Sequence, residues 1–262
     1  MPSSLSQLFS KAYELVKVSE KHDRVLPIIF AFVPLIAVFS SYMILFVGFY
    51  VAFVFNPDIF VGVVVAFFAL ILFSVAFSLY ITYVLIRRRN EHFRRSVEFF
   101  SAVSEISSAL GFKRSASIRE RLRDLASVSG FRRAVLNTVL SIIPFYSIYI
   151  YHFLNRDFHK HSEKELLILR ELLDELREYA VSSQGQHTIP HQLFHEIDTF
   201  GVVEKRSTAL YTVATIFTFG IFAIYWLYTL VNDPNKHFEK HKAVDKVVVQ
   251  SLEAVARGRG LL

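Results

Sequence analysis

Two long uncharged runs dominate the pattern of hydrophobic and polar positions in the chain. Residues 25–56 and residues 59–86 contain no Asp, Glu, Lys or Arg. A helix that crosses the hydrocarbon layer of a membrane needs about 20 apolar residues, so both runs are long enough. The Asn56-Pro57-Asp58 sequence between them has room only for a tight turn. The pattern therefore predicts an antiparallel transmembrane hairpin over residues 25–86.

Two further apolar segments, residues 134–154 and 208–231, are each interrupted by a helix breaker. Pro144 and Gly220 occupy aligned positions in the two segments. Each segment is either a kinked full span or a re-entrant hairpin of two half-helices. Residues 155–207 hold seven Lys/Arg and ten acids, and this poor basic balance favours four full spans with 155–207 outside the cell. The repeat described below favours re-entrant hairpins, because similar sequences would then face similar surroundings.

The polar stretches between these segments have helical periodicity. Residues 1–24 predict an amphipathic helix that lies in the membrane interface, and residues 87–133 carry twelve Lys/Arg against five acids. Within the second stretch, a capping sequence at Ser117 predicts a helix with Ile118, Leu122 and Leu125 on one face, resting on the cytoplasmic leaflet. Residues 163–180 predict a soluble helix that packs on the rest of the chain or forms a short coiled-coil seam between subunits.

These segments together predict an all-α integral membrane protein with amphipathic interfacial helices. It has an N-terminal transmembrane hairpin and two membrane segments broken by Pro or Gly. The predicted divisions are residues 1–24, 25–86, 87–133, 134–154, 155–207, 208–231 and 232–262.

One unit recurs three times, as a membrane segment that exits through aromatic residues into a charged helix bearing His. Its copies place a Tyr before a His as Tyr80 and His92, Tyr149 and His161, and Tyr225 and His237. The twelve-residue separation is about 18 Å along a helix. It predicts an aromatic belt at headgroup depth and a solvated His beyond the surface. The alternative is a site for headgroup phosphate or for pH sensing, formed by several copies together.

The distribution of charge predicts the orientation of the chain in the membrane, and the composition limits the kinds of partner it can have. Lys and Arg flank both ends of the hairpin and none lies at its turn, so the N-terminus is expected in the cytoplasm of a multi-pass cell-membrane protein. The net charge of +6 is explained by these flanking residues, and no nucleic-acid partner is expected. The lipid bilayer is the expected partner, and a homo-oligomer or a membrane-protein partner stays open. The absence of Cys excludes disulfides and thiolate metal sites.

The histidines suggest one metal site. His191 and His195 are four residues apart on a predicted helix, and Glu196 is adjacent. Two His one turn apart and a carboxylate can bind a divalent metal ion, but interfacial or solvated His is the default interpretation and the metal site is the alternative. His237 and His241 repeat the spacing, but the sequence between them is not H-E-x-x-H.

No catalytic motif is present, and the predicted spans contain no ionisable acid or base. Ion-coupled carriers usually need such a residue at mid-membrane. The sequence therefore favours a non-enzymatic, membrane-anchored structural or interaction protein built from three variant repeats, with no cofactor. The alternatives are a pore or carrier for a neutral or apolar solute, and a His-dependent membrane metalloenzyme.

The segment Gly220-Ile221-Phe222-Ala223-Ile224-Tyr225-Trp226 resembles the core of a prokaryotic multi-pass membrane-protein family. Its members carry a short apolar segment that reads roughly G-I-Y-x-I-Y-W, followed by a polar helix. The resemblance covers about 35 residues, and residues 143–155 form a poorer second copy. Phe222 stands where the family usually has Tyr. Because that family has no established activity, the resemblance implies architecture and no chemistry.

Overall fold

The computed structural model describes residues 4–182 and 191–262, and every regular element in these ranges is a helix. The all-α prediction is confirmed. The elements are α1 (Leu5–His22), η1 (Ile28–Ala31), α2 (Val33–Val54), η2 (Pro57–Ile59), α3 (Phe60–Ala109), α4 (Ser115–Val128), α5 (Ala134–Leu140), α6 (Tyr146–Ser182), α7 (His191–Asp198), α8 (Thr208–Phe217) and α9 (Ile221–Gly258).

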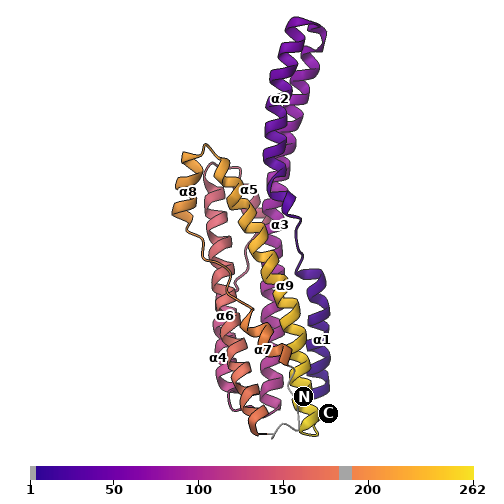
Figure 1. Cartoon of the computed structure of the whole chain (residues 1–262), viewed down its shortest axis with the longest axis vertical. Coiled ribbons are helices and arrows are strands. Elements are labelled where there is room, and N and C mark those ends of the chain that lie inside the picture. The colour runs from indigo at the N-terminus through magenta and orange to yellow at the C-terminus, as the bar shows by residue number, and fades with distance from the viewer. Residues whose placement is uncertain (1–3, 183–190) are drawn as a thin grey trace.

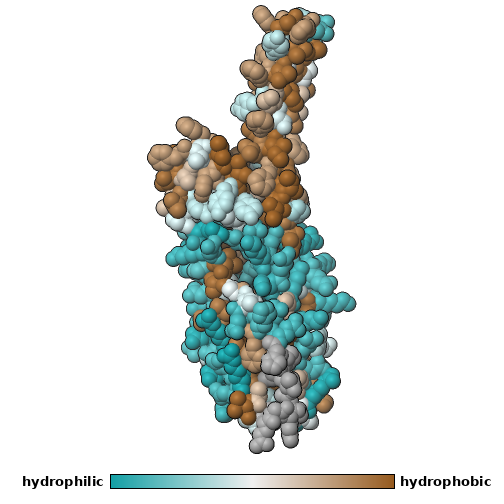
Figure 2. Space-filling model, viewed as in Figure 1, coloured by the Kyte–Doolittle hydropathy of each residue, from teal (hydrophilic) through white to brown (hydrophobic). Residues whose placement is uncertain are grey.

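A two-helix hairpin made by α2 and the first half of α3 stands clear of the rest of the molecule (Figure 1). Its surface is apolar, with side chains such as Phe46 77% exposed (Figure 2). The 22 residues of α2 span about 33 Å, close to the 30 Å hydrocarbon thickness of a bilayer. In the described ranges, two helices are long and apolar enough to cross a membrane: α2, and α3 together with the short η2 that precedes it.

The two interrupted segments are short hairpins and not kinked spans. Pro144 lies in the turn between α5 and α6, and Gly220 lies between α8 and α9 with a φ of +92°, a conformation that favours Gly. The chain reverses at each turn, so the polar segments lie together at one end of the molecule (Figure 1). With seven and ten residues, α5 and α8 are too short to cross a membrane. The described residues hold two candidate spans and not the four expected, and each interrupted segment is a hairpin of two helices, which is the geometry that the alternative predicted.

The polar end of the molecule is a helical bundle around the long helices α3, α6 and α9. Its core takes Leu8 and Phe9 from α1 and Ile118 and Leu125 from α4. Both helices were expected to rest on the membrane, but their apolar faces are covered by protein, so that expectation is wrong. The predicted helix start at Ser117 is also wrong, because α4 begins at Ser115. The Leu face of residues 163–180 packs on the rest of the chain, as one of its two alternatives predicted.

A buried arginine compensates for a proline inside α9. Pro234 has no N–H and leaves the carbonyl of Leu230 without its usual helical donor. Arg88 of α3 donates to that carbonyl at 2.8 Å and to the carbonyl of Val231 at 3.0 Å. It also donates to the side chain of Asn235, whose amide pairs with the backbone of Leu26. This network fixes α3 against α9 just below the apolar hairpin.

Candidate metal centre

Four side chains that could hold a metal ion lie together where α3, α6 and α9 run side by side in the bundle (Figure 1). They are His92 of α3, Glu165 of α6, and His237 and His241 of α9, and their ligand atoms all lie within 4.8 Å of one another. His237 and His241 share a helix face because they are one turn apart. None of the four is more than 4% exposed.

The carboxylate of Glu165 is the centre of this cluster. Its Oε1 lies 2.8 Å from Nε2 of His241 and 2.9 Å from Nε2 of His161, and its Oε2 lies 3.0 Å from Nε2 of His237. Nε2 of His92 lies 3.2 Å from Nε2 of His237. Four imidazole nitrogens therefore converge on one carboxylate, and His161 is a fifth potential ligand.

Three of the four histidines are oriented through their outer nitrogens. Nδ1 of His92 lies 2.9 Å from Asp23, and Nδ1 of His241 lies 2.8 Å from Asp245. Nδ1 of His161 lies 2.9 Å from the hydroxyl of Ser129, which donates its own proton to a backbone carbonyl. An acceptor at Nδ1 holds the proton there and turns the lone pair of Nε2 toward the centre. This support of the ligands is typical of metal sites in proteins.

Arg95 ties the two supporting carboxylates together. Its guanidinium lies 2.7 Å from Asp23 and 2.6 Å from Asp245, and all three side chains are buried. Burying a carboxylate is costly unless a cation compensates it. Arg95 therefore allows Asp23 and Asp245 to stay ionised beside the histidines.

Some atoms at the centre lack a well-aligned hydrogen bond. Nε2 of His161 and Oε2 of Glu165 are buried and have no hydrogen-bond partner, although each lies about 3 Å from another polar atom of the cluster. Buried polar atoms are rarely left in this state. A cation between these lone pairs would satisfy them together.

The protonation of the cluster is set by burial and by neighbouring charges. Burial lowers the pKa of His92 to about 3 and also lowers the pKa of His161, so both present neutral imidazole. Burial disfavours charge on His241 as well, but Asp245 and Glu165 raise its pKa to about 10. Burial would raise the pKa of Glu165, but the surrounding histidines hold it well below its usual value. A metal ion binding here would replace the proton on Nε2 of His241.

This donor set can hold a divalent transition-metal ion. Imidazole nitrogen with one carboxylate oxygen suits Zn²⁺ or Fe²⁺, whereas Mg²⁺ and Ca²⁺ prefer oxygen ligands. The ring of Phe200 covers His237 and His241, with centroids 5.3 and 5.4 Å away. Beyond this ring, a cavity of about 300 Å³ is lined by His237, Lys236 and Lys240.

The structure brings together the three histidines of the repeated unit and leaves their tyrosines apart. Tyr80, Tyr149 and Tyr225 are exposed. His92, His161 and His237 are buried at one point, so the expectation that they are solvated beyond the surface is wrong. The alternative had several copies forming one site, and that arrangement is what the structure has.

The other predicted metal site is not part of this cluster. His195 is exposed on α7 and Glu196 is half-buried, and the side chain of His191 lies outside the described residues. Sequence reasoning missed Glu165 and its supporting residues. The spacing of His161 and Glu165, one helical turn apart, was the available signal.

A comparison of the chain with protein-family models, curated proteins and solved structures found no match. The resemblance of residues 220–226 to a prokaryotic membrane-protein family stays a prediction.

Proposed function

We propose that this is a membrane-anchored, non-enzymatic protein whose helical bundle is held together by a divalent transition-metal ion. The observation that carries this proposal is the convergence of His92, Glu165, His237 and His241 within 4.8 Å in a buried site. Because these ligands come from α3, α6 and α9, one ion would join the three long helices. Metal binding would then contribute directly to the stability of the fold.

The closed surroundings favour a structural ion over a catalytic one. Structural zinc sites take all their ligands from the protein, whereas catalytic sites keep a position open for water or substrate. Here the four ligands are nearly inaccessible: His237 borders the adjacent cavity but is only 4% exposed, and the ring of Phe200 packs against His237 and His241. The proposal of a His-dependent metalloenzyme would require this ring to move.

The hairpin supplies the proposed anchor in the cell membrane. Its two helices would cross the bilayer, and the short α5–α6 and α8–α9 hairpins would enter it from the bundle side. The basic residues at the base of the hairpin, including Arg24 and Arg87, favour a cytoplasmic bundle and N-terminus. The three histidines, each twelve residues after a tyrosine on its own helix, support an origin from three variant repeats.

The alternative of a pore or carrier has less support. The space between the membrane-end segments is filled by an apolar cluster that includes Leu85, Phe153, Trp226 and Leu230. A solute pathway would need a polar lining through this region. The packing favours a structural or interaction role, with a second copy or another membrane protein as partner of the exposed hairpin.

Elemental analysis of the purified chain tests the metal proposal. Protein extracted in detergent without chelator is expected to carry about one transition-metal ion per chain. Glu165→Gln should lose the metal, because it removes the only carboxylate in the cluster. His195→Ala is the matched control, since His195 is exposed and outside the cluster. A metal-free wild type, or metal that is lost from the His195 variant and kept by the Glu165 variant, would reject the proposal.

A further inference from the structure

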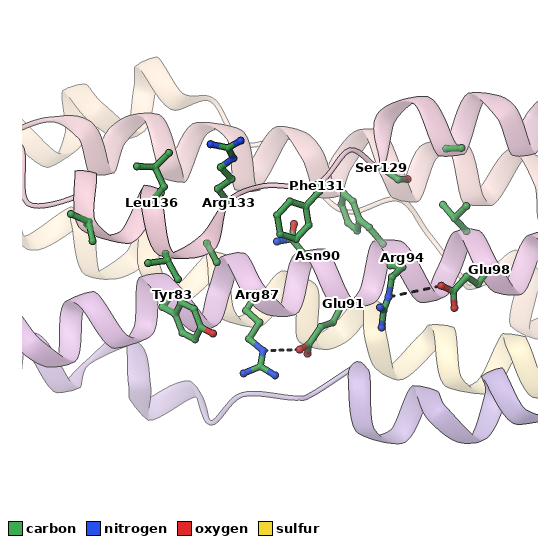
Figure 3. A pocket seen from close by; sticks show the side chains of 16 residues that line it. Tyr83, Arg87, Asn90, Glu91, Arg94, Glu98, Ser129, Phe131, Arg133 and Leu136 are labelled. Atoms are coloured by element: carbon green, nitrogen blue, oxygen red, sulfur yellow. Dashed lines mark hydrogen bonds and ion pairs between the residues drawn. The ribbon is translucent and has the colours of Figure 1, made fainter.

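A large groove lies between α3 and the chain segment that leads from α4 into α5 (Figure 3). Its volume is about 1110 Å³. One wall is α3, from Tyr83 at its membrane end to Glu98 inside the bundle, and the other includes Phe131, Arg133, Leu136 and Val139. The groove therefore crosses the level at which the apolar surface gives way to the hydrophilic one (Figure 2).

The outer wall of the groove is apolar and unusually exposed. Phe131 is 77% exposed, and Val135, Leu136 and Val139 of α5 are exposed as well. A contiguous apolar surface of this kind usually has a partner. α5 belongs to a short hairpin at the end of the bundle from which the apolar α2–α3 hairpin extends (Figure 1). In the proposed membrane anchor, the acyl chains of lipids would contact this surface.

Cations stand where the apolar wall begins. Arg87 follows the uncharged run of α3 and pairs with Glu91 at 2.7 Å on the rim (Figure 3). Arg133 precedes α5, is exposed, and its guanidinium has no hydrogen bond or ion pair with another described residue. In Figure 3 the two side chains point to opposite sides of the groove, so Arg133 is the free guanidinium beside the apolar wall, and it matches a phosphate diester joined to acyl chains.

We propose that this groove binds one anionic phospholipid of the surrounding leaflet. Its phosphate binds Arg133, with Arg87 adding positive charge at the same end of the groove, and an acyl chain follows Val135, Leu136 and Val139 toward the hydrocarbon layer. A zwitterionic lipid fits less well, because its headgroup cation offsets the charge that the arginines attract. The inference rests on the proposed membrane anchor and does not require the metal ion.

The bound lipid would also cover the outer side of the metal centre. Phe93 and Ser129 line the groove. The ring of Phe93 stacks on His161 with centroids 3.7 Å apart, and the hydroxyl of Ser129 bonds the same histidine. Lipid in the groove would therefore exclude water from this layer of side chains.

Native mass spectrometry of the full chain tests the proposal. The protein is reconstituted in nanodiscs of equal parts phosphatidylcholine and phosphatidylglycerol and then released, and the retained lipids are counted. Wild type is expected to retain one phosphatidylglycerol and to keep it when inorganic phosphate is added. Arg87→Gln with Arg133→Gln should reduce that retained fraction about tenfold, which corresponds to about 1.4 kcal/mol.

The control removes two positive charges outside the groove, with Arg24→Gln and Lys205→Gln. Both residues are exposed, and this variant should retain lipid like the wild type. Equal loss in the control, equal retention of phosphatidylcholine, displacement by free phosphate, or full retention in the groove variant would each overturn the proposal. If the double variant does not fold, Arg133→Gln alone should reduce retention in the same direction.

The same samples separate this proposal from the proposed function. Metal content is measured beside lipid retention. If the wild type retains lipid but contains no metal, the metal centre is rejected and the proposed lipid site is retained. A chain that stays in the aqueous fraction without detergent or lipid would reject the membrane anchor, and the lipid site with it.

Discussion

The two halves of α3 place their side chains in opposite ways. In the first half, apolar side chains face outward, and Leu72 is 70% exposed. In the second half, charged side chains face inward, and Arg88 is only 2% exposed, with Arg95 and His92 buried nearby. One continuous helix therefore has an apolar surface at one end and an ionic core at the other.

The difference shows that each half depends on a different partner. The outward apolar side chains of the first half favour an apolar solvent, and in the proposed membrane anchor lipid would stabilise this half. The buried charges of the second half are stable only when each meets a counter-charge or a hydrogen-bonding group. Mutations in the first half should therefore change membrane insertion, and mutations in the second half should change the stability of the bundle. The two effects can be measured separately.

The largest effect is expected from Glu165→Gln in the ionic half. This substitution removes the negative charge that faces three histidines and should destabilise the bundle by about 3–5 kcal/mol. The measurement is thermal unfolding in detergent, with and without a chelator. Chelator should lower the melting temperature of the wild type and leave that of the variant unchanged. An equal change in melting temperature in both proteins would mean that Glu165 is not a metal ligand.

An intermediate effect is expected from Phe46→Arg in the apolar half. Phe46 lies near the middle of α2, where an arginine costs about 2.5–3.5 kcal/mol for membrane insertion. The membrane-inserted fraction should fall, and it should stay unchanged in the matched variant Phe46→Leu. If the hairpin faces water, the arginine would instead leave the protein folded and increase its solubility, which would contradict the comparison.

A smaller effect is expected from Arg88→Met at the junction of the two halves. Methionine keeps the apolar stem but leaves the carbonyl of Leu230 without a donor, which costs about 1–3 kcal/mol. Thermal unfolding should show this loss. The neighbouring Arg87→Met is the control and should not change the melting temperature, because Arg87 is exposed. Equal effects at the two positions would mean that Arg88 does not compensate for Pro234.

The sequence predicted the helical class and the apolar hairpin, because both depend on local patterns. The length of each charge-free run predicted a long apolar helix, and Pro144 and Gly220 correctly predicted where the two shorter segments are interrupted. The choice between kink and reversal was wrong, because it depends on how the half-helices pack and the charge balance of a loop is only indirect evidence.

Part of the candidate metal centre could be predicted from the sequence. The recurring interval from tyrosine to histidine placed His92, His161 and His237 at one height on three helices. Their burial could not be predicted, because the interval does not say whether those faces turn toward one another or toward solvent. Asp23 and Asp245 were not predicted for the same reason, since they reach the cluster from distant parts of the chain.

X-ray absorption spectroscopy at the metal edge of the purified protein tests the central claim most directly. The account predicts a first shell of nitrogen and oxygen with metal–nitrogen distances of about 2.0–2.1 Å if the ion is zinc, together with the multiple-scattering signature of several imidazoles. That signature should be absent from the Glu165→Gln variant. A first shell made of water oxygens, or one that is identical in the two proteins, would contradict a metal ion at the meeting point of α3, α6 and α9.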